Sequence, residues 1–176
     1  MKSKSILGVV AICTVISSSF LMLPWQSTTV FALINVPTNQ VISPIKGKTQ
    51  VPILIPSKLP FSELEKVYFN SEVTDKGYSV SFNYTPDCQG TPCYIGSIEA
   101  ERGGEFIKPE RGITRAFKRV RLAGGNQGVF HNGCGAYCTA TLEWKYQGIL
   151  YRVTIKNGEE KDLIAIANSA IQAGRR

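Results

Sequence analysis

The stretch YCTATLEWKYQGILYRVTIKNG, residues 137–158, decides the fold of this chain. Apolar and polar side chains alternate along both of its halves, and this period of two is typical of half-buried β-strands. One face of each half is apolar: Cys138, Ala140, Leu142, Trp144 and Tyr146 in the first, and Ile149, Tyr151, Val153 and Ile155 in the second. Gln147-Gly148 stands between the halves, where a two-residue turn is expected. The stretch therefore predicts an antiparallel hairpin with an aromatic core face.

An amphipathic helix is predicted directly after this hairpin. Acidic residues at positions 159, 160 and 162 follow Asn157-Gly158, and the dipole of a helix favours negative charge at its start. Apolar residues then recur at helical spacing from Leu163 to Ile171, and Gly174 can end the helix. A hairpin with one apolar face and a helix with one apolar stripe bury each other. The expected class is α+β, a single mostly antiparallel β-sheet with a C-terminal helix packed on one face.

The hairpin and helix also carry a resemblance. The pattern Trp144-x-x-x-Gly148-x-x-Tyr151, followed by the helix that contains LIAIANS at residues 163–169, resembles the terminal hairpin and helix of uncharacterised exported bacterial proteins. It is also similar to the terminal module of some sigma-factor-regulatory and lipoprotein-sorting-like extracellular domains. The resemblance covers residues 137–171 and rests on packing residues. It implies the fold and carries over no catalytic positions.

A second hairpin is predicted upstream. Residues 77–85 alternate, with Tyr78, Val80 and Phe82 on one face, and residues 92–101 return as the partner strand. Residues 51–56 contain two prolines, which predicts a short edge strand. Residues 33–50 are rich in Pro, Asn, Thr and Lys without a lasting period, which predicts an extended leader. The β domain is therefore expected to span residues 51–176.

Residues 1–32 have the pattern of a secretory signal peptide. Lys2 and Lys4 precede an apolar run that ends at Pro24, and Val30-Phe31-Ala32 offers small residues at the two positions that a signal peptidase reads. An uncleaved anchor is the alternative, because the run of about 18 residues approaches the length of a membrane span. Cleavage after Ala32 removes two lysines and no acids, so the net charge falls from +7 to +5. We expect a secreted or periplasmic protein with no transmembrane segment after cleavage.

Four cysteines remain after the signal: Cys88, Cys93, Cys134 and Cys138. In an oxidising compartment an even number of cysteines predicts disulfides, with three possible connectivities. Glycine lies between the two members of each sequence-local pair, and this favours local bridges. The alternatives are a four-cysteine zinc site and a redox pair, but the C-x4-C and C-x3-C spacings differ from zinc knuckles and from C-x-x-C. No metal ion and no other cofactor is expected.

Basic residues concentrate in one segment, and no acid follows Glu110 until Glu143. The five basic residues are Arg111, Arg115, Lys118, Arg119 and Arg121. On a strand, the arginines at 115, 119 and 121 would share one face, and Lys118 would lie on the other with Val120. Such a face can attract phosphates, anionic lipid headgroups or acidic cell-wall polymers. It can also simply protect a sheet edge from aggregation, and export argues against nucleic acid as the partner.

Catalytic motifs are scarce. No G-x-S-x-G or H-E-x-x-H pattern occurs. The one histidine, His131, lies near Cys134, whose thiol a disulfide would remove. Four glutamates could supply paired carboxylates for glycoside cleavage: Glu99, Glu101, Glu105 and Glu110. The sequence favours a non-enzymatic exported module that binds an anionic envelope surface or a protein partner through the basic strand and the cysteine loops. The alternative is a small secreted hydrolase that uses the His131 region.

Overall fold

The structure is a computed structural model of the 176-residue chain. It describes residues 33–61, 66–108 and 117–176. The signal peptide predicted for residues 1–32 lies outside the described residues, and so do Glu110, Arg111 and Arg115.

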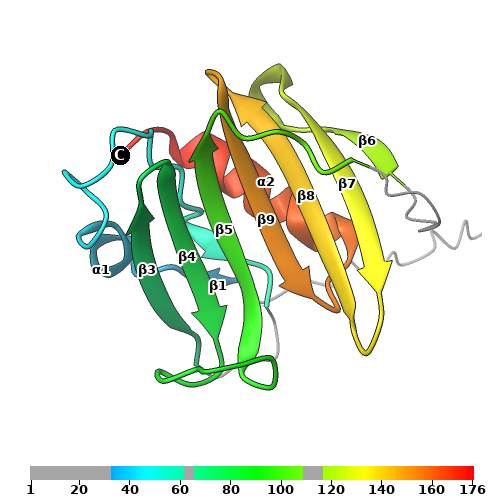
Figure 1. Ribbon diagram of the computed structural model, residues 1–176, viewed down its shortest axis with the longest axis horizontal. Helices are drawn as coiled ribbons and strands as arrows, with labels where there is room; N and C mark the ends of the chain where they lie inside the picture. Colours follow the sequence, from blue (N-terminus) through cyan, green and yellow to red (C-terminus); the bar gives the residue numbers. More distant parts are fainter. Residues whose placement is uncertain (1–32, 62–65, 109–116) are drawn as a thin grey trace, which may run out of the picture. The chain divides into compact units, whose positions relative to one another are not determined.

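In the part of the chain that the structure describes, seven strands form one antiparallel sheet in the order β3-β4-β5-β9-β8-β7-β6 (Figure 1). The strands are β3 (Tyr68–Thr74), β4 (Gly77–Asn83), β5 (Tyr94–Arg102), β6 (Phe117–Arg121), β7 (Gln127–Cys134), β8 (Cys138–Tyr146) and β9 (Ile149–Lys156). A separate pair joins β1 (Ile34–Asn35) to β2 (Lys58–Leu59). The helices are α1 (Thr38–Ile42), α2 (Glu160–Ala173) and a short 3-10 helix, Ala123–Gly125. This arrangement confirms the predicted α+β class.

The predicted hairpin of residues 137–158 is confirmed as β8 and β9. These strands pair from Thr139 opposite Lys156 to Tyr146 opposite Ile149. Gln147 and Gly148 both have positive φ, as a tight two-residue hairpin turn requires. Trp144 and Tyr151 lie directly opposite each other and stack with ring centroids 5.5 Å apart, which places the aromatic pair in the core.

The predicted helix is confirmed as α2. A capping box at its start joins the Glu159 and Asp162 side chains to backbone N–H groups, which satisfies donors that the helix leaves unpaired. Its apolar stripe is buried against β8 and β9: Leu163, Ile166, Ala167 and Ala170. Asn168 accepts a hydrogen bond from the Ala123 N–H at 2.7 Å, which fixes the helix against the loop after β6.

Residues 33–61 differ from the expected leader and edge strand. The segment that was expected to be extended contains β1 and α1, and it buries four side chains in the core: Val36, Val41, Ile42 and Ile45. Residues 51–56 join no sheet, and all of them except Pro52 are buried. The Tyr78 hydroxyl donates to the Leu54 carbonyl and accepts from its N–H, and the Tyr151 hydroxyl donates to the Pro52 carbonyl. Tyrosine side chains thus replace the ladder that prolines interrupt.

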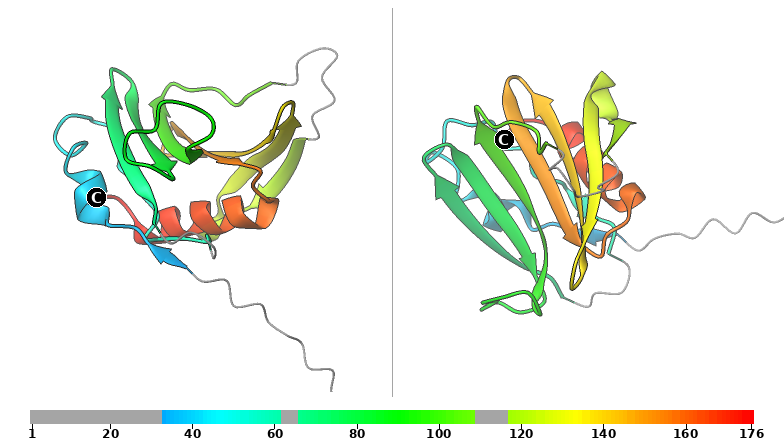
Figure 2. Two further views of the ribbon diagram at one scale, coloured as in Figure 1. Left: turned by 90° about the horizontal axis from the view of Figure 1, so that it is seen from below. Right: turned by 45° about the vertical axis from the view of Figure 1, so that its right-hand side comes forward.

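The two faces of the sheet are covered differently. Helix α2 and residues 51–59 lie on one face, called the helix face below. Residues 103–108, called the crossing segment, lead from β5 over the opposite, open face in front of β9 and β8 (Figures 1 and 2). The Ile107 N–H bonds to Glu143 on that face, and the Lys145 ammonium lies 5.7 Å from the Phe106 ring centroid. The open face is therefore where polar side chains can gather without a helix over them.

Candidate functional site on the open face

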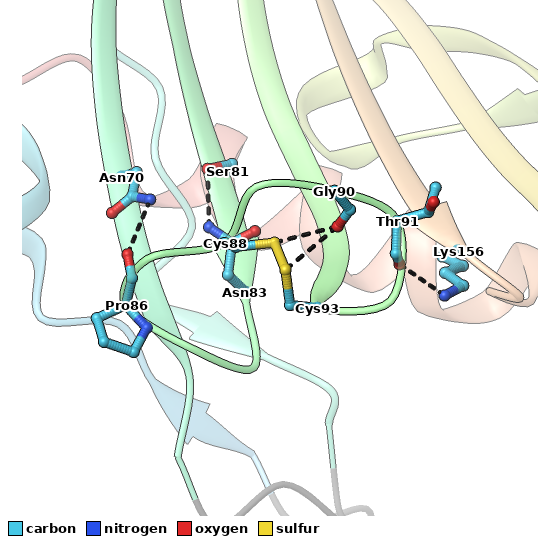
Figure 3. Close-up of a disulfide and its surroundings, with 9 residues drawn as sticks. All are labelled: Asn70, Ser81, Asn83, Pro86, Cys88, Gly90, Thr91, Cys93 and Lys156. Carbon is cyan, nitrogen blue, oxygen red and sulfur yellow. Dashed lines mark hydrogen bonds between the residues drawn. A yellow bond between two sulfur atoms is a disulfide. The ribbon is translucent and has the colours of Figure 1, made fainter.

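The predicted local disulfides are confirmed. Cys88 bonds to Cys93 in the loop between β4 and β5 (Figure 3). The Gly90 carbonyl oxygen lies 3.2 Å from both sulfur atoms; this is a contact and not a hydrogen bond, since a disulfide sulfur has no hydrogen to donate. Lys156 of β9 donates to the Thr91 carbonyl at 2.8 Å. The disulfide therefore holds the base of this loop, and the hydrogen bond from Lys156 holds its tip.

The second disulfide joins Cys134 to Cys138, which lie opposite each other at the ends of β7 and β8. It closes a turn of three residues whose exposed ring is Tyr137. All four cysteines are bonded, so none of them offers a thiolate to a zinc ion or a nucleophile to His131. Among the described residues, no group of three or more His, Cys, Asp and Glu side chains is placed to hold a metal ion.

The predicted basic segment is divided between the two faces of β6, an edge strand of the sheet. Lys118 lies on the helix face with the buried Val120 and forms an ion pair with Glu160 of α2, at 2.8 Å. Arg119 and Arg121 lie on the open face and are exposed. This division of faces agrees with the one expected from alternation. Of the five basic residues predicted to act together, the structure therefore describes only Arg119 and Arg121 on the same face.

A third cation, which the sequence analysis missed, lies on the same face. Arg121 pairs with Gln127, and Gly128 pairs with Trp144, so the register brings Lys145 of β8 beside Gln127. Lys145 is exposed. The ion pairs that the structure describes include none of the three cations, called the basic cluster below: Arg119, Arg121 and Lys145. Lys145 could have been predicted as a member of this cluster from the register of the strands, because alternation already places it on the polar face of β8.

Further into the open face, a buried network holds the crossing segment. Glu143 is 0% exposed and accepts hydrogen bonds from Arg152 Nε and from the Ile107 N–H, each at 2.8 Å. Arg152 also reaches Glu99 at 3.3 Å, and Ser97 donates to Glu99 at 3.0 Å. Burial opposes the charged form of Arg152, but the hydrogen bond and the charge of Glu143, helped by Glu99, raise its pKa. The guanidinium therefore stays charged and links two carboxylates.

The glutamates considered for catalysis do not gather at one point in the described part of the chain. Glu99 and Glu101 share the open face of β5 and both line a pocket of about 460 Å³ with Asp75 and Lys76. Glu105 is exposed and pairs with Lys108 at 2.9 Å. The hydrogen bond from Lys108 lowers the Glu105 pKa, and its charge adds to the effect. Glu99 forms an ion pair with Arg152 and therefore belongs to the buried network described above.

His131 lies in the middle of β7 on the open face and is 2% exposed. Its ring lies against Phe117 of β6, with centroids 5.1 Å apart. It lines a pocket of about 480 Å³ together with Thr139, Thr141 and the Cys134–Cys138 turn. The sequence predicted His131 as a candidate but gave no sign of the threonines beside it.

No protein-family model, no curated protein and no solved structure matches this chain. None of the described helices has the length and apolar character needed to cross a bilayer. The family resemblance of residues 137–171 stays a prediction.

Proposed function

We propose that this protein is an exported, non-enzymatic module that binds an anionic polymer of the cell envelope through the basic cluster of Arg119, Arg121 and Lys145. The observation that carries the proposal is the placement of these three exposed cations on one face of β6 and β8, outside every described ion pair. Export is supported by the signal pattern of residues 1–32 and by the two disulfides, which are typical of oxidising compartments.

The three cations suit a polymer better than a single small anion. Arg119 and Arg121 are two residues apart on one strand, and this spacing separates their stems by about 7 Å. Lys145 extends the row across Gln127. A repeating anion can contact all three cations at once, whereas a lone phosphate can contact only its nearest neighbours. Each cation near an anionic surface contributes about 1 kcal/mol, and salt weakens the attraction.

Edge protection is the competing role for the same charges. A charged edge strand resists pairing with another chain, and all three basic residues of β6 can serve that purpose. The two roles make different predictions for Lys118. It can protect the edge of the sheet, but it cannot act with the basic cluster because it faces α2 and pairs with Glu160. Lys118 therefore supplies a matched control from the same strand.

The test measures binding of the purified protein to immobilised polyphosphate and to polyglutamate at low and high salt. The variant R119Q/R121Q/K145Q removes the basic cluster, and K118Q removes one cation of the opposite face. We expect the triple variant to lose at least about tenfold in affinity at low salt and K118Q to retain wild-type binding. Equal binding by all three proteins would contradict the proposal, and increased self-association of both variants would support edge protection in its place.

A further inference from the structure

A second pocket on the open face lies at the end of β7 and β8, near the Cys134–Cys138 turn. Its volume is about 480 Å³, within the range of small-molecule sites. The crossing segment contributes Ile107 on one side, and the disulfide-closed turn forms another. The bridge fixes this turn, so the pocket exists before any ligand arrives.

The side chains that line this pocket are polar but uncharged. The described lining contains no aspartate, glutamate, lysine or arginine. It offers the hydroxyls of Thr139 and Thr141, which project from the open face of β8, and the His131 ring, which lies directly opposite Thr141. An ionic ligand would find no counter-charge among these residues, and a purely apolar one would leave the hydroxyls without partners.

Thr141 is the most informative of these residues. It is 4% exposed and makes no side-chain hydrogen bond in the described part of the chain, but its oxygen is not among the described buried polar atoms that lack a partner, so this oxygen can be reached from the pocket. Thr139, two residues along on the same face, makes no side-chain hydrogen bond there either. Thr139 is half-buried. Both hydroxyls are therefore open to the pocket, where a ligand can take the place of water as their hydrogen-bond partner.

Tyr137 adds an aromatic surface at the rim. It is 39% exposed, and it lies between the two bridged cysteines. The Lys156 ammonium lies 5.3 Å from its ring centroid, and Lys156 is itself bonded to the Thr91 carbonyl. The ammonium of Lys156 thus restrains the ring on one side. A restrained, exposed aromatic ring can stack on an apolar ligand face at little cost in conformational entropy.

We infer that this pocket binds a neutral saccharide. A sugar ring presents hydroxyls at its edge and C–H groups on its face, so it can bond to Thr139 and Thr141 while it stacks on Tyr137. The inference does not depend on the basic cluster, because its ligand carries no charge. The two sites adjoin, since His131 lies opposite Phe117, two residues before Arg119 on the same face.

The test is a ¹H–¹⁵N correlation titration of the purified full-length protein with glucose, galactose, mannose and N-acetylglucosamine, each to about 10 mM. We expect at least one sugar to shift the amide resonances of Gly133 and residues 137–141. Two variants probe the site without disturbing the core: Y137A removes the ring, and T139V replaces a hydroxyl by a methyl group of the same size. Both variants should weaken binding, Y137A by about tenfold or more.

Two control variants show whether sugar binding depends on this pocket. Tyr84 is 48% exposed and follows β4 in the loop of the other disulfide, so Y84A should leave sugar binding unchanged. R119Q/R121Q/K145Q should also bind the sugar as the wild type does, even if it no longer binds polyanions. Absence of any shift with all four sugars would overturn the inference. So would a loss in Y84A equal to the loss in Y137A.

Discussion

Replacing Tyr78 by phenylalanine tests how the segment at residues 51–56 is held. The Tyr78 hydroxyl lies 2.9 Å from the Leu54 nitrogen and 3.2 Å from its oxygen, and both residues are buried. Phenylalanine fills the same space, so no cavity forms, but the Leu54 N–H and C=O lose their partner. Each buried backbone group left unpaired costs about 1–3 kcal/mol. We expect Y78F to lower the free energy of unfolding by about 2–4 kcal/mol.

Urea unfolding followed by circular dichroism measures this loss, and the melting temperature should fall by about 10 °C. The control is Y84F, since Tyr84 is exposed and its hydroxyl has no hydrogen bond in the described part of the chain. A loss below about 0.5 kcal/mol in Y78F, the scatter of surface substitutions, would refute the view that this hydroxyl replaces a strand ladder.

The same variant should change the response to alkali. Burial raises the pKa of Tyr78, the Leu54 hydrogen bond lowers it to a smaller extent, and Tyr151 raises it. Its folded-state pKa therefore lies above the unfolded value of about 10. Its contribution is fully present below a pH of about 10 and is lost as the pH rises, because the unfolded chain releases the proton first. The loss is about 1.4 kcal/mol per pH unit, and Y78F should show a slope smaller by that amount.

Three further predictions concern the sheet and its loops. E143Q should lower the free energy of unfolding by about 3 kcal/mol, because it leaves Arg152 partly buried without one of its counter-ions, and hydrogen exchange at Ile107 should accelerate. C88S/C93S should cost about 2 kcal/mol in chemical unfolding, since its loop is short. G96A should prevent β5 from pairing with β9, because a Cβ there would meet the Thr154 carbonyl oxygen; unchanged stability of the variant would contradict this packing.

The sequence predicted those parts of the fold whose determinants are contiguous. The β8–β9 hairpin follows from alternation and from a turn with positive φ at Gln147 and Gly148. Helix α2 follows from its apolar spacing and from the acidic residues at its start. The pairing of β5 with β9 joins residues such as Ile98 and Val153, far apart in the chain. No local pattern specifies such a pairing.

The first described residues show a different limit. In residues 33–50 the apolar side chains are separated by prolines and polar residues at irregular spacing. They nevertheless belong to the core, so no periodic pattern in the sequence predicts their burial. The stretch at 51–56 is predicted from its sequence to be a short edge strand, but in the structure it joins no sheet. Its partners are the hydroxyls of Tyr78 and Tyr151, and alternation placed both tyrosines only as core residues. A side chain that bonds to the backbone leaves no periodic signal.

The candidate site was predictable only in part. Alternation correctly separated Lys118 from Arg119 and Arg121, but the ion pair of Lys118 with Glu160 depends on where α2 lies. Lys145 joined the basic cluster only through the register of three strands. Local disulfides were predicted because each cysteine pair flanks a glycine turn, and the pocket beside one of them needed the crossing segment to place Ile107.

On the open face, several polar residues are buried, so a polar residue in this sequence does not always indicate an exposed side chain. Alternation assigns Ser97, Thr141 and Glu143 to the side away from the core, and such residues normally face water. Here all three are buried, and Glu143 is bonded to the crossing segment. Arg152 and the Ile107 N–H satisfy Glu143, and Glu99 satisfies Ser97, whereas no described group bonds to the hydroxyl of Thr141. T141V removes this hydroxyl and keeps the shape of the side chain, so it separates a binding role from a packing role. It should weaken sugar binding and change the free energy of unfolding by no more than about 0.5 kcal/mol, whereas a threonine with a purely structural role would leave sugar binding unchanged.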